Sequence, residues 1–225
     1  MTLSPALLRR VETQVLADLK PVKCLPPARF FLLAFAAVFL LLAAGGAYRL
    51  GPYGWLWLTA VQRIEVFGSL AASATLLGVS LVRQMVPGSN HRISPAMVPV
   101  GVFVLLLLAL AGAFHYSPEP NALGSGISCL RAGIPYGLPA ALMFWLLLRR
   151  GFVLSPRVTG TAAGALAGLV ALTILEVHCP DPDVLHIITF HLGALVIGTV
   201  GGFMVGSAGA FCQVGARWAD VGRGD

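Results

Sequence analysis

Long runs without charge alternate with short polar segments along the whole chain. The clearest run, residues 30–48, reads FFLLAFAAVFLLLAAGGAY. As an α-helix it would be about 28 Å long, close to the roughly 30 Å of a bilayer's hydrocarbon core. It starts too far from the first residue and is too long for a signal peptide, and no small-residue cleavage site follows it. The pattern therefore predicts a membrane-spanning helix.

Six such runs follow one another along the chain. They cover residues 30–48, 65–82, 96–114, 133–148, 158–177 and 184–208. We expect helices because a helix satisfies its own backbone hydrogen bonds in lipid, and because the runs lack the alternation of outer-membrane strands. Pro135 and Pro139 interrupt the fourth run, but membrane helices tolerate proline, usually as a kink. The predicted fold class is all-α: a polytopic membrane protein with six transmembrane helices.

Composition agrees with this class. Hydrophobic residues make up 57% of the 225 positions and charged residues only 11%. Soluble domains carry about 25% charged residues, so a soluble globular protein is excluded.

Lysine and arginine are distributed unequally between the two sides of the predicted spans. Twelve lie on the side of both termini and three on the other. Cytoplasmic segments carry the excess, so both termini are expected inside, at a bacterial inner membrane. The net charge of +6 reflects this bias, and no clustered basic face predicts a nucleic-acid partner.

One polar stretch interrupts the apolar pattern on the outer side. Residues 176–191 read EVHCPDPDVLHIITFH, with three histidines and one cysteine. Thiolate and imidazole together suit zinc or copper. However, His186 and His191 are five positions apart, about 140° around an α-helix, so we expect them to face different ways and to hydrogen-bond near the interface. The sequence therefore predicts no preformed metal site and no cofactor.

The four cysteines divide equally between the two sides. Cys24 and Cys212 lie on the cytoplasmic side, whereas Cys129 opens the fourth span and Cys179 lies between the fifth and the sixth. Disulfides persist in oxidising compartments, so only the outer pair is a candidate redox pair. Two isolated thiols too far apart to bond remain the alternative, because spacing does not fix geometry.

Features typical of enzymes and transporters are missing. No acid, lysine or arginine lies deep within a predicted span, whereas transporters usually carry such groups on their pathway. We find no nucleophile–base pattern, HExxH, phosphate-binding loop or CxxC. We therefore expect no enzymatic activity.

Small residues recur at helical spacing in the last two spans. The fifth has Gly160, Gly164 and Gly168, and the sixth has Gly198, Gly202 and Gly206. Such faces let helices approach closely in lipid. Packing within one chain is the default interpretation, and a homo-oligomer interface is the alternative.

The chain is expected to have three parts: a cytoplasmic tail (1–29), a six-helix membrane domain (30–210) and a C-terminal cytoplasmic tail (211–225). In the first tail, Leu8, Val11, Val15 and Leu19 form one apolar stripe of a helix that Pro21 ends. A helix of about sixteen residues is marginal alone in water, so the stripe needs a surface. Either membrane lipids or a groove on a cytoplasmic protein would provide one.

The chain resembles the NrsF-type anti-sigma factors. The resemblance rests on VLADLKPVKCLPPAR in the tail, SCLRAGIPYGLP leading to LLRRG, and SPRVTGTAAGALAGL leading to HCPDPDVLHIITFH. It is most specific at DLKPV, at the junction from Arg149 to Gly160, and at His178-Cys179-Pro180. One departure is Phe190, which stands where the family pattern has tryptophan before His191.

The resemblance implies a function for the tail and for the outer cysteines. Such proteins hold an extracytoplasmic-function sigma factor at the inner membrane and release it under stress. The implied sigma-binding motif is Asp18, Leu19, Lys20, Pro21 and Val22, beside the apolar stripe. Cys129 and Cys179 become a sensor pair for a metal or oxidative signal, with His178 as a neighbour that lowers a thiol pKa. The alternative function is a membrane thiol–disulfide protein or a small transporter with a lipid-resting tail.

Overall fold

The computed structural model describes residue 13 and residues 26–86, 93–117, 122–151, 153 and 155–209. The predicted sigma-binding positions lie outside the described residues; they are Leu8, Val11, Val15, Asp18, Leu19, Lys20, Pro21 and Val22. The C-terminal tail predicted at 211–225 lies outside them as well.

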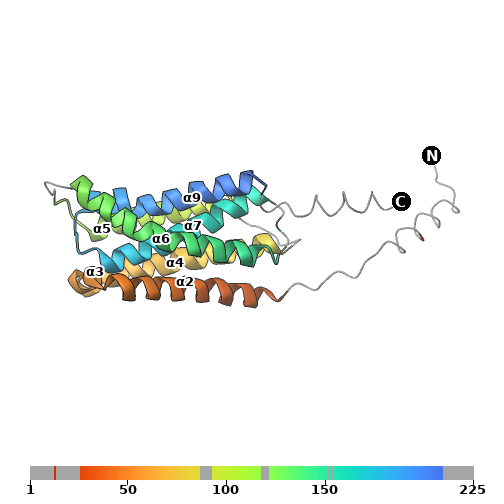
Figure 1. The fold of residues 1–225 in the computed structure, drawn as a ribbon, viewed down its shortest axis with the longest axis horizontal. Coiled ribbons are helices and arrows are strands. Elements are labelled where there is room, and N and C mark those ends of the chain that lie inside the picture. The colour runs from red at the N-terminus through yellow and green to blue at the C-terminus, as the bar shows by residue number, and fades with distance from the viewer. Residues whose placement is uncertain are drawn as a thin grey trace.

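Every regular element in the described ranges is a helix, and the long helices run side by side in one bundle (Figure 1). The long elements are α2 (Ala28–Leu50), α4 (Ala60–Met85), α5 (Met97–Ala113), α6 (Ala122–Leu148), α7 (Pro156–His178) and α9 (Leu192–Ser207). The short ones are α3 (Tyr53–Trp57), α8 (Val184–His186) and a π-helical turn, η1 (Ile187–His191), which continues into α9.

Five helical stretches are long and apolar enough to cross a membrane: α2, α4, α6, α7 and the continuous stretch of α8, η1 and α9. The remaining predicted span, α5, is an apolar helix of 17 residues. The all-helical, membrane-type fold is therefore confirmed.

The fourth predicted span differs most from the structure. It was expected to begin at residue 133, but α6 begins at Ala122 and continues through Pro135 and Pro139. Proline can be accommodated because neighbouring helices re-satisfy the freed backbone groups. Cys129 consequently lies within α6 rather than at its beginning.

The central helix of the bundle is α7, in which nearly every residue from Thr159 to Glu176 is buried. Its glycines pack directly on those of α9. A Cβ atom at Gly164 would meet the carbonyl oxygen of Gly198, and one at Gly202 would meet that of Gly160. The small-residue faces of α7 and α9 therefore pack against each other within one chain, which was the default interpretation of the glycine spacing.

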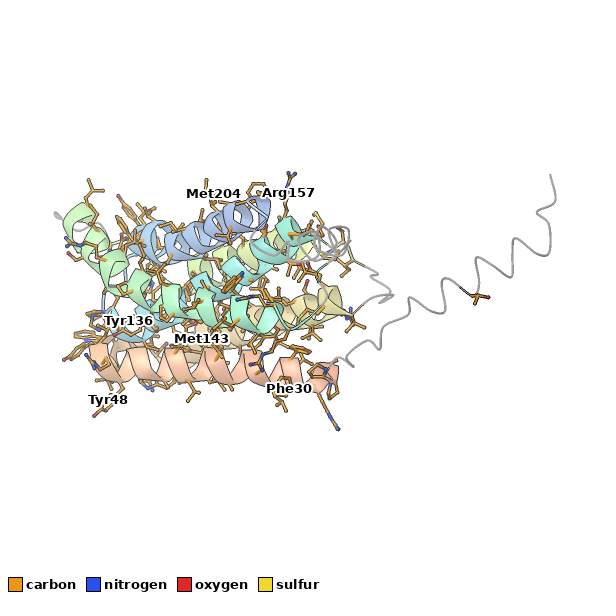
Figure 2. All side chains as sticks on the ribbon, turned by 45° about the vertical axis from the view of Figure 1, so that its right-hand side comes forward. Phe30, Tyr48, Tyr136, Met143, Arg157 and Met204 are labelled. Atoms are coloured by element: carbon orange, nitrogen blue, oxygen red, sulfur yellow. The ribbon has the colours of Figure 1, made fainter. Side chains whose placement is uncertain are left out.

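The outer surface of the bundle is apolar, as lipid contact requires. Leu33 and Leu41 of α2 are 70% and 73% exposed. Met143 of α6 and Met204 of α9 also lie on the outside, while Phe30 and Tyr48 mark the two ends of α2 (Figure 2). Aromatic residues at both helix ends are typical of the two membrane–water interfaces.

The two ends of the bundle differ in charge. One end, which we name the basic end, carries Arg29, Arg83, Arg149, Arg150 and Arg157. The other, the acidic end, carries all four acids of the described ranges: Glu65, Glu176, Asp181 and Asp183. The candidate chemistry gathers at the acidic end.

Candidate functional site

Four side chains that can bind a metal meet at the acidic end: Cys129, Cys179, His186 and His191. One donor atom from each lies within 4.8 Å of all the others. Cys129 comes from α6, Cys179 follows the last residue of α7, and the histidines come from α8 and η1. We name this group the Cys–His cluster.

The two cysteines of the cluster are in direct contact. Their Sγ atoms are 3.2 Å apart, and both thiols are free. The prediction that the outer cysteines form a pair therefore holds in space, although the structure shows a thiol pair rather than a disulfide. The alternative of two distant thiols is wrong.

Both histidines face the cysteines, contrary to the expectation from helical periodicity. His186 Nε2 lies 3.5 Å from Cys179 Sγ, and the rings of His186 and His191 have centroids 5.3 Å apart. The physical reason is the π turn: the Leu192 N–H donates to the carbonyl of Ile187, five residues back. A π turn has more residues per turn than an α-helix, so positions five apart share a face.

A carboxylate lies behind each histidine of the cluster. Asp181 Oδ2 lies 3.1 Å from His186 Nδ1, and Glu176 Oε1 lies 2.9 Å from His191 Nδ1. The other ring nitrogen of His191, Nε2, is buried and has no hydrogen-bond partner among the described residues. In metal sites a carboxylate on the outer ring nitrogen fixes the tautomer that leaves the inner nitrogen free to bind.

The segment between α7 and α8 is held in place by its own aspartates. Asp183 Oδ2 accepts the N–H of His186 as an N-cap of α8, and its Oδ1 accepts the N–H of Ser117. Asp181 Oδ1 accepts the N–H of Asp183. These hydrogen bonds fix the direction in which His186 leaves the chain.

Two glycines let other elements approach the cluster closely. A Cβ atom at Gly54 of α3 would meet the carbonyl oxygens of Cys179 and Glu176. A Cβ atom at Gly126 of α6 would meet the ring of Phe190, which packs on His186 with centroids 5.4 Å apart. Phe190 therefore supports the cluster from the side of α6.

His178, predicted as a partner of the thiols, lies outside the cluster. Its Nδ1 is 3.3 Å from the carbonyl oxygen of Gly51, and its ring packs on Tyr53 with centroids 5.8 Å apart. Being adjacent in sequence to Cys179 does not place the two side chains together, because successive helical residues project in different directions. The histidines that do meet the thiols are His186 and His191.

The surroundings keep the Cys179 thiol protonated. Contact with the Cys129 thiol raises the pKa of Cys179, and burial raises it further, against the neighbouring rings of His186 and His191, which lower it. A cavity of about 40 Å³ lies beside Cys179, lined also by Gln62, Glu176 and Asp181. It is large enough to hold a water molecule or an ion beside Cys179 at the acidic end.

Sequence reasoning missed four residues of this arrangement: His186 and His191 as metal-facing groups, and Glu176 and Asp181 behind them. One signal was present. Ionisable residues within or next to apolar spans are costly unless they pair, so a glutamate at the end of one span and a histidine inside the next are candidates for a functional pair.

One family model matches the chain: NrsF, described as negative regulator of sigma F, over residues 16–209. The match includes the DLKPV motif, both cysteines and both histidines of the cluster. No curated protein and no solved structure matches the chain.

Proposed function

Because the chain belongs to the NrsF family of negative regulators of sigma F, we propose that it is an anti-sigma factor that senses a metal ion outside the cytoplasmic membrane. It holds an extracytoplasmic-function sigma factor through its N-terminal segment and releases it when the Cys–His cluster binds the ion. It acts by binding and has no enzymatic activity.

The proposed topology has six spans, with α5 as the third and both termini in the cytoplasm. The five arginines of the basic end support it, since cytoplasmic ends of spans carry the excess of positive charge. The acidic end then faces the periplasm of a bacterial inner membrane, where external metal ions reach the cluster.

The observation that carries the proposal is the convergence of four donor atoms within 4.8 Å, with a carboxylate behind each histidine. Two thiolates and two imidazoles form a set of ligands for zinc or for softer ions such as copper(I). Binding replaces the thiol protons, and the raised pKa of Cys179 means that the free site holds its proton until a metal competes for the sulfur.

Metal binding would change the distance between the two sulfurs. In a tetrahedral site with Zn–S bonds of about 2.3 Å, the sulfurs are about 3.8 Å apart. The sulfurs are 3.2 Å apart in the free cluster, so binding would separate them, and we propose that α6 and the end of α7 move apart with them. The metal would then bind the two arrangements of α6 and α7 with different affinities, which a conformational switch requires.

The movement of α6 can reach the tail through α2. Phe144 of α6 packs on Phe35 of α2 with ring centroids 5.7 Å apart, and both rings are buried. The tail joins α2 directly at Ala28. To shift sigma from almost wholly bound to almost wholly free, the metal must bind the sigma-free state more tightly by about 5.5 kcal/mol. Less is needed if the two states are already nearly equal in free energy without metal.

An oxidant is the second candidate signal, because the same 3.2 Å contact would let Cys129 and Cys179 form a disulfide. Oxidation needs only the thiols, whereas metal binding also needs His186 and His191. Dependence on the histidines therefore separates the two signals.

The test is recovery of a sigma factor with the full-length chain from membranes. The altered chain replaces Leu8, Val15 and Leu19 with serine, and a matched control replaces the polar-face residues Glu12 and Gln14 with serine. We expect the wild type and the control to retain the sigma factor and the stripe variant to lose it. Equal recovery with all three chains, or none with the wild type, would refute the proposed function.

A further inference from the structure

A long apolar groove lies between α6 and α9, away from the Cys–His cluster, and α7 forms its floor. Its volume is about 490 Å³. At one end it reaches Ile134, Ala171 and Ala194, and at the other Trp145, Gly160 and Val205. Most residues between these ends are glycine or alanine, so little side-chain volume fills the space.

The groove is open because α9 packs on α7 through glycines and leaves α6 further away. Gly201 of α9 lines the groove, and a Cβ atom built there would meet no atom within 4 Å. By contrast, a Cβ atom at Gly202, the next residue, would meet the backbone of α7. One face of α9 therefore packs on α7, and the adjacent face lines the open groove.

The length of the groove fits an acyl chain of a lipid. Each of the three helices contributes a stretch of twelve residues whose ends are about 16 Å apart, which is about half of a hydrocarbon core of roughly 30 Å. One acyl chain of a lipid covers the same half of the core, from its headgroup at the surface to the middle of the bilayer.

The end of the groove at Trp145 is polar and positively charged. The indole Nε1 atom of Trp145 is buried and has no hydrogen-bond partner among the described residues. The guanidinium of Arg149 lies 4.6 Å from the centre of the Trp145 ring. Arg157, at the start of α7, lies on the outside near the end of α9 (Figure 2). No acid of the described ranges lies at this basic end.

We propose that this groove binds one acyl chain of an anionic phospholipid whose phosphate lies at Arg149 and Trp145. The groove holds the acyl chain over about the depth of one leaflet. The arginine offers the planar guanidinium that suits a phosphate. Negative charge on the headgroup is required because the rim carries cations and no described acid.

The test measures lipid bound to the purified full-length chain by native mass spectrometry, after delipidation and addition of either phosphatidylglycerol or phosphatidylcholine. Gly201→Leu fills the groove from an open position, and Ala141→Leu fills it from α6. The matched control is Gly45→Leu, on α2, where a Cβ atom also meets nothing within 4 Å. Helical content by circular dichroism checks that each variant is folded.

The wild type and Gly45→Leu should each retain one phosphatidylglycerol, and both groove variants should lose it. Arg149→Gln should retain it more weakly, whereas Arg131→Gln, at the other end of α6, should not change it. Retention by folded groove variants would overturn the proposal, and equal retention of phosphatidylcholine, which carries the same phosphate but no net charge, would overturn the requirement for a negatively charged headgroup. A dimer that depends on Gly201 would instead assign the groove to a second copy.

Discussion

Glu176 and His191 form a buried pair that joins α7 to the π turn. Glu176 Oε1 lies 2.9 Å from His191 Nδ1, and the side chains are 2% and 1% exposed. Such a pair is stable only when both partners are present, since removal of one leaves the other buried and unpaired, at a cost of about 3–5 kcal/mol. The pair therefore fixes the orientation of His191 toward the cysteines.

Glu176→Gln tests this orienting role without removing the acceptor. The amide oxygen can still accept from His191 Nδ1, so we expect a folded protein. The loss of the carboxylate should weaken Cd²⁺ binding about 10–100-fold, the usual effect of altering a residue behind a metal ligand. The measurement is titration of the purified chain with Cd²⁺, followed by the ultraviolet absorption of Cd–thiolate bonds.

Glu65→Gln is the matched control, because Glu65 is an exposed acid of the same end. It should bind Cd²⁺ as the wild type does. Equal affinity in Glu176→Gln and Glu65→Gln would show that Glu176 has no part in the site.

Substitutions tested in cells can distinguish the four proposed ligands of the cluster from the neighbouring His178. Cys129→Ser, Cys179→Ser, His186→Gln and His191→Gln should each abolish release of the sigma factor by zinc or cadmium, because each removes one of four ligands. His178→Gln should respond normally, since His178 contacts Gly51 and Tyr53 instead. Transcription from a sigma-dependent promoter provides the measurement.

Two patterns of response would contradict the metal proposal. If only the cysteine variants fail to respond to zinc or cadmium, the thiols hold the metal without the histidines, and the four-ligand site is wrong. If His178→Gln fails as completely as His191→Gln, the geometry of the cluster does not determine sensing.

Much of the fold was predictable because lipid imposes a simple rule on sequence: apolar runs of sufficient length become helices. The runs at 30–48 and 158–177 correspond to α2 and α7 within a few residues. The glycine spacing likewise predicted close helix packing, which the seam between Gly164 and Gly198 confirms.

The cluster was only half predictable. The order of the predicted spans places Cys129 and Cys179 at the same end of the bundle, so the two could be grouped. The histidines were placed apart because the prediction assumed 100° per residue through His186 and His191, whereas the chain forms a π turn there. No residue pattern in IITFH predicts that turn, and the contacts of η1 with α6 and α7 are not visible in the sequence.

Gly54 should be intolerant of a side chain because α3 packs on the backbone of the cluster. A Cβ atom there would lie 2.7 Å from the carbonyl oxygen of Glu176, and would also meet that of Cys179. Backbone atoms yield less readily than flexible side chains, so we expect Gly54→Ala to cost about 1–3 kcal/mol and to weaken Cd²⁺ binding. The apparent Tm in detergent and the Cd²⁺ titration measure the two effects.

Gly68→Ala, on α4, is the control, because a Cβ atom there meets nothing within 4 Å. It should keep the apparent Tm of the wild type or raise it slightly, since alanine favours a helix. An unchanged Tm and unchanged Cd²⁺ affinity in Gly54→Ala would mean that α3 does not support the cluster.

Gly164→Ala should destabilise the pair of α7 and α9 without altering the metal ligands. Its Cβ atom would meet the carbonyl oxygen of Gly198 and would lie 2.8 Å from the Cα atom of Gly202. We expect a lower apparent Tm by the same overpacking mechanism, with Cd²⁺ affinity close to that of the wild type. Gly78→Ala, at an open position of α4, is the control. A Tm equal to that of Gly78→Ala would show that the glycine seam can separate freely.

Removing the contact between Phe35 and Phe144 tests whether metal binding at the cluster changes the tail through α2. The rings are buried and their centroids are 5.7 Å apart, far from the cluster along the chain of α6. Phe35→Leu keeps an apolar side chain but removes the ring contact, so Cd²⁺ affinity of the purified chain should stay within about twofold of the wild type. The Cd²⁺-induced loss of sigma binding should weaken by about 0.5–2 kcal/mol, or about 2- to 30-fold, as expected for a residue on a coupling route.

Measuring both quantities on one preparation separates coupling from sensing. Phe39→Leu, one turn further along α2, is the matched control for a general loosening of that helix. If Phe35→Leu and Phe39→Leu change sigma release equally, the effect is not specific to the contact with Phe144. If Phe35→Leu leaves release unchanged, the signal leaves α6 by another helix, and α7 becomes the next route to test, because Thr159 of α7 donates a hydrogen bond of 2.9 Å to Gln84 of α4 at the basic end.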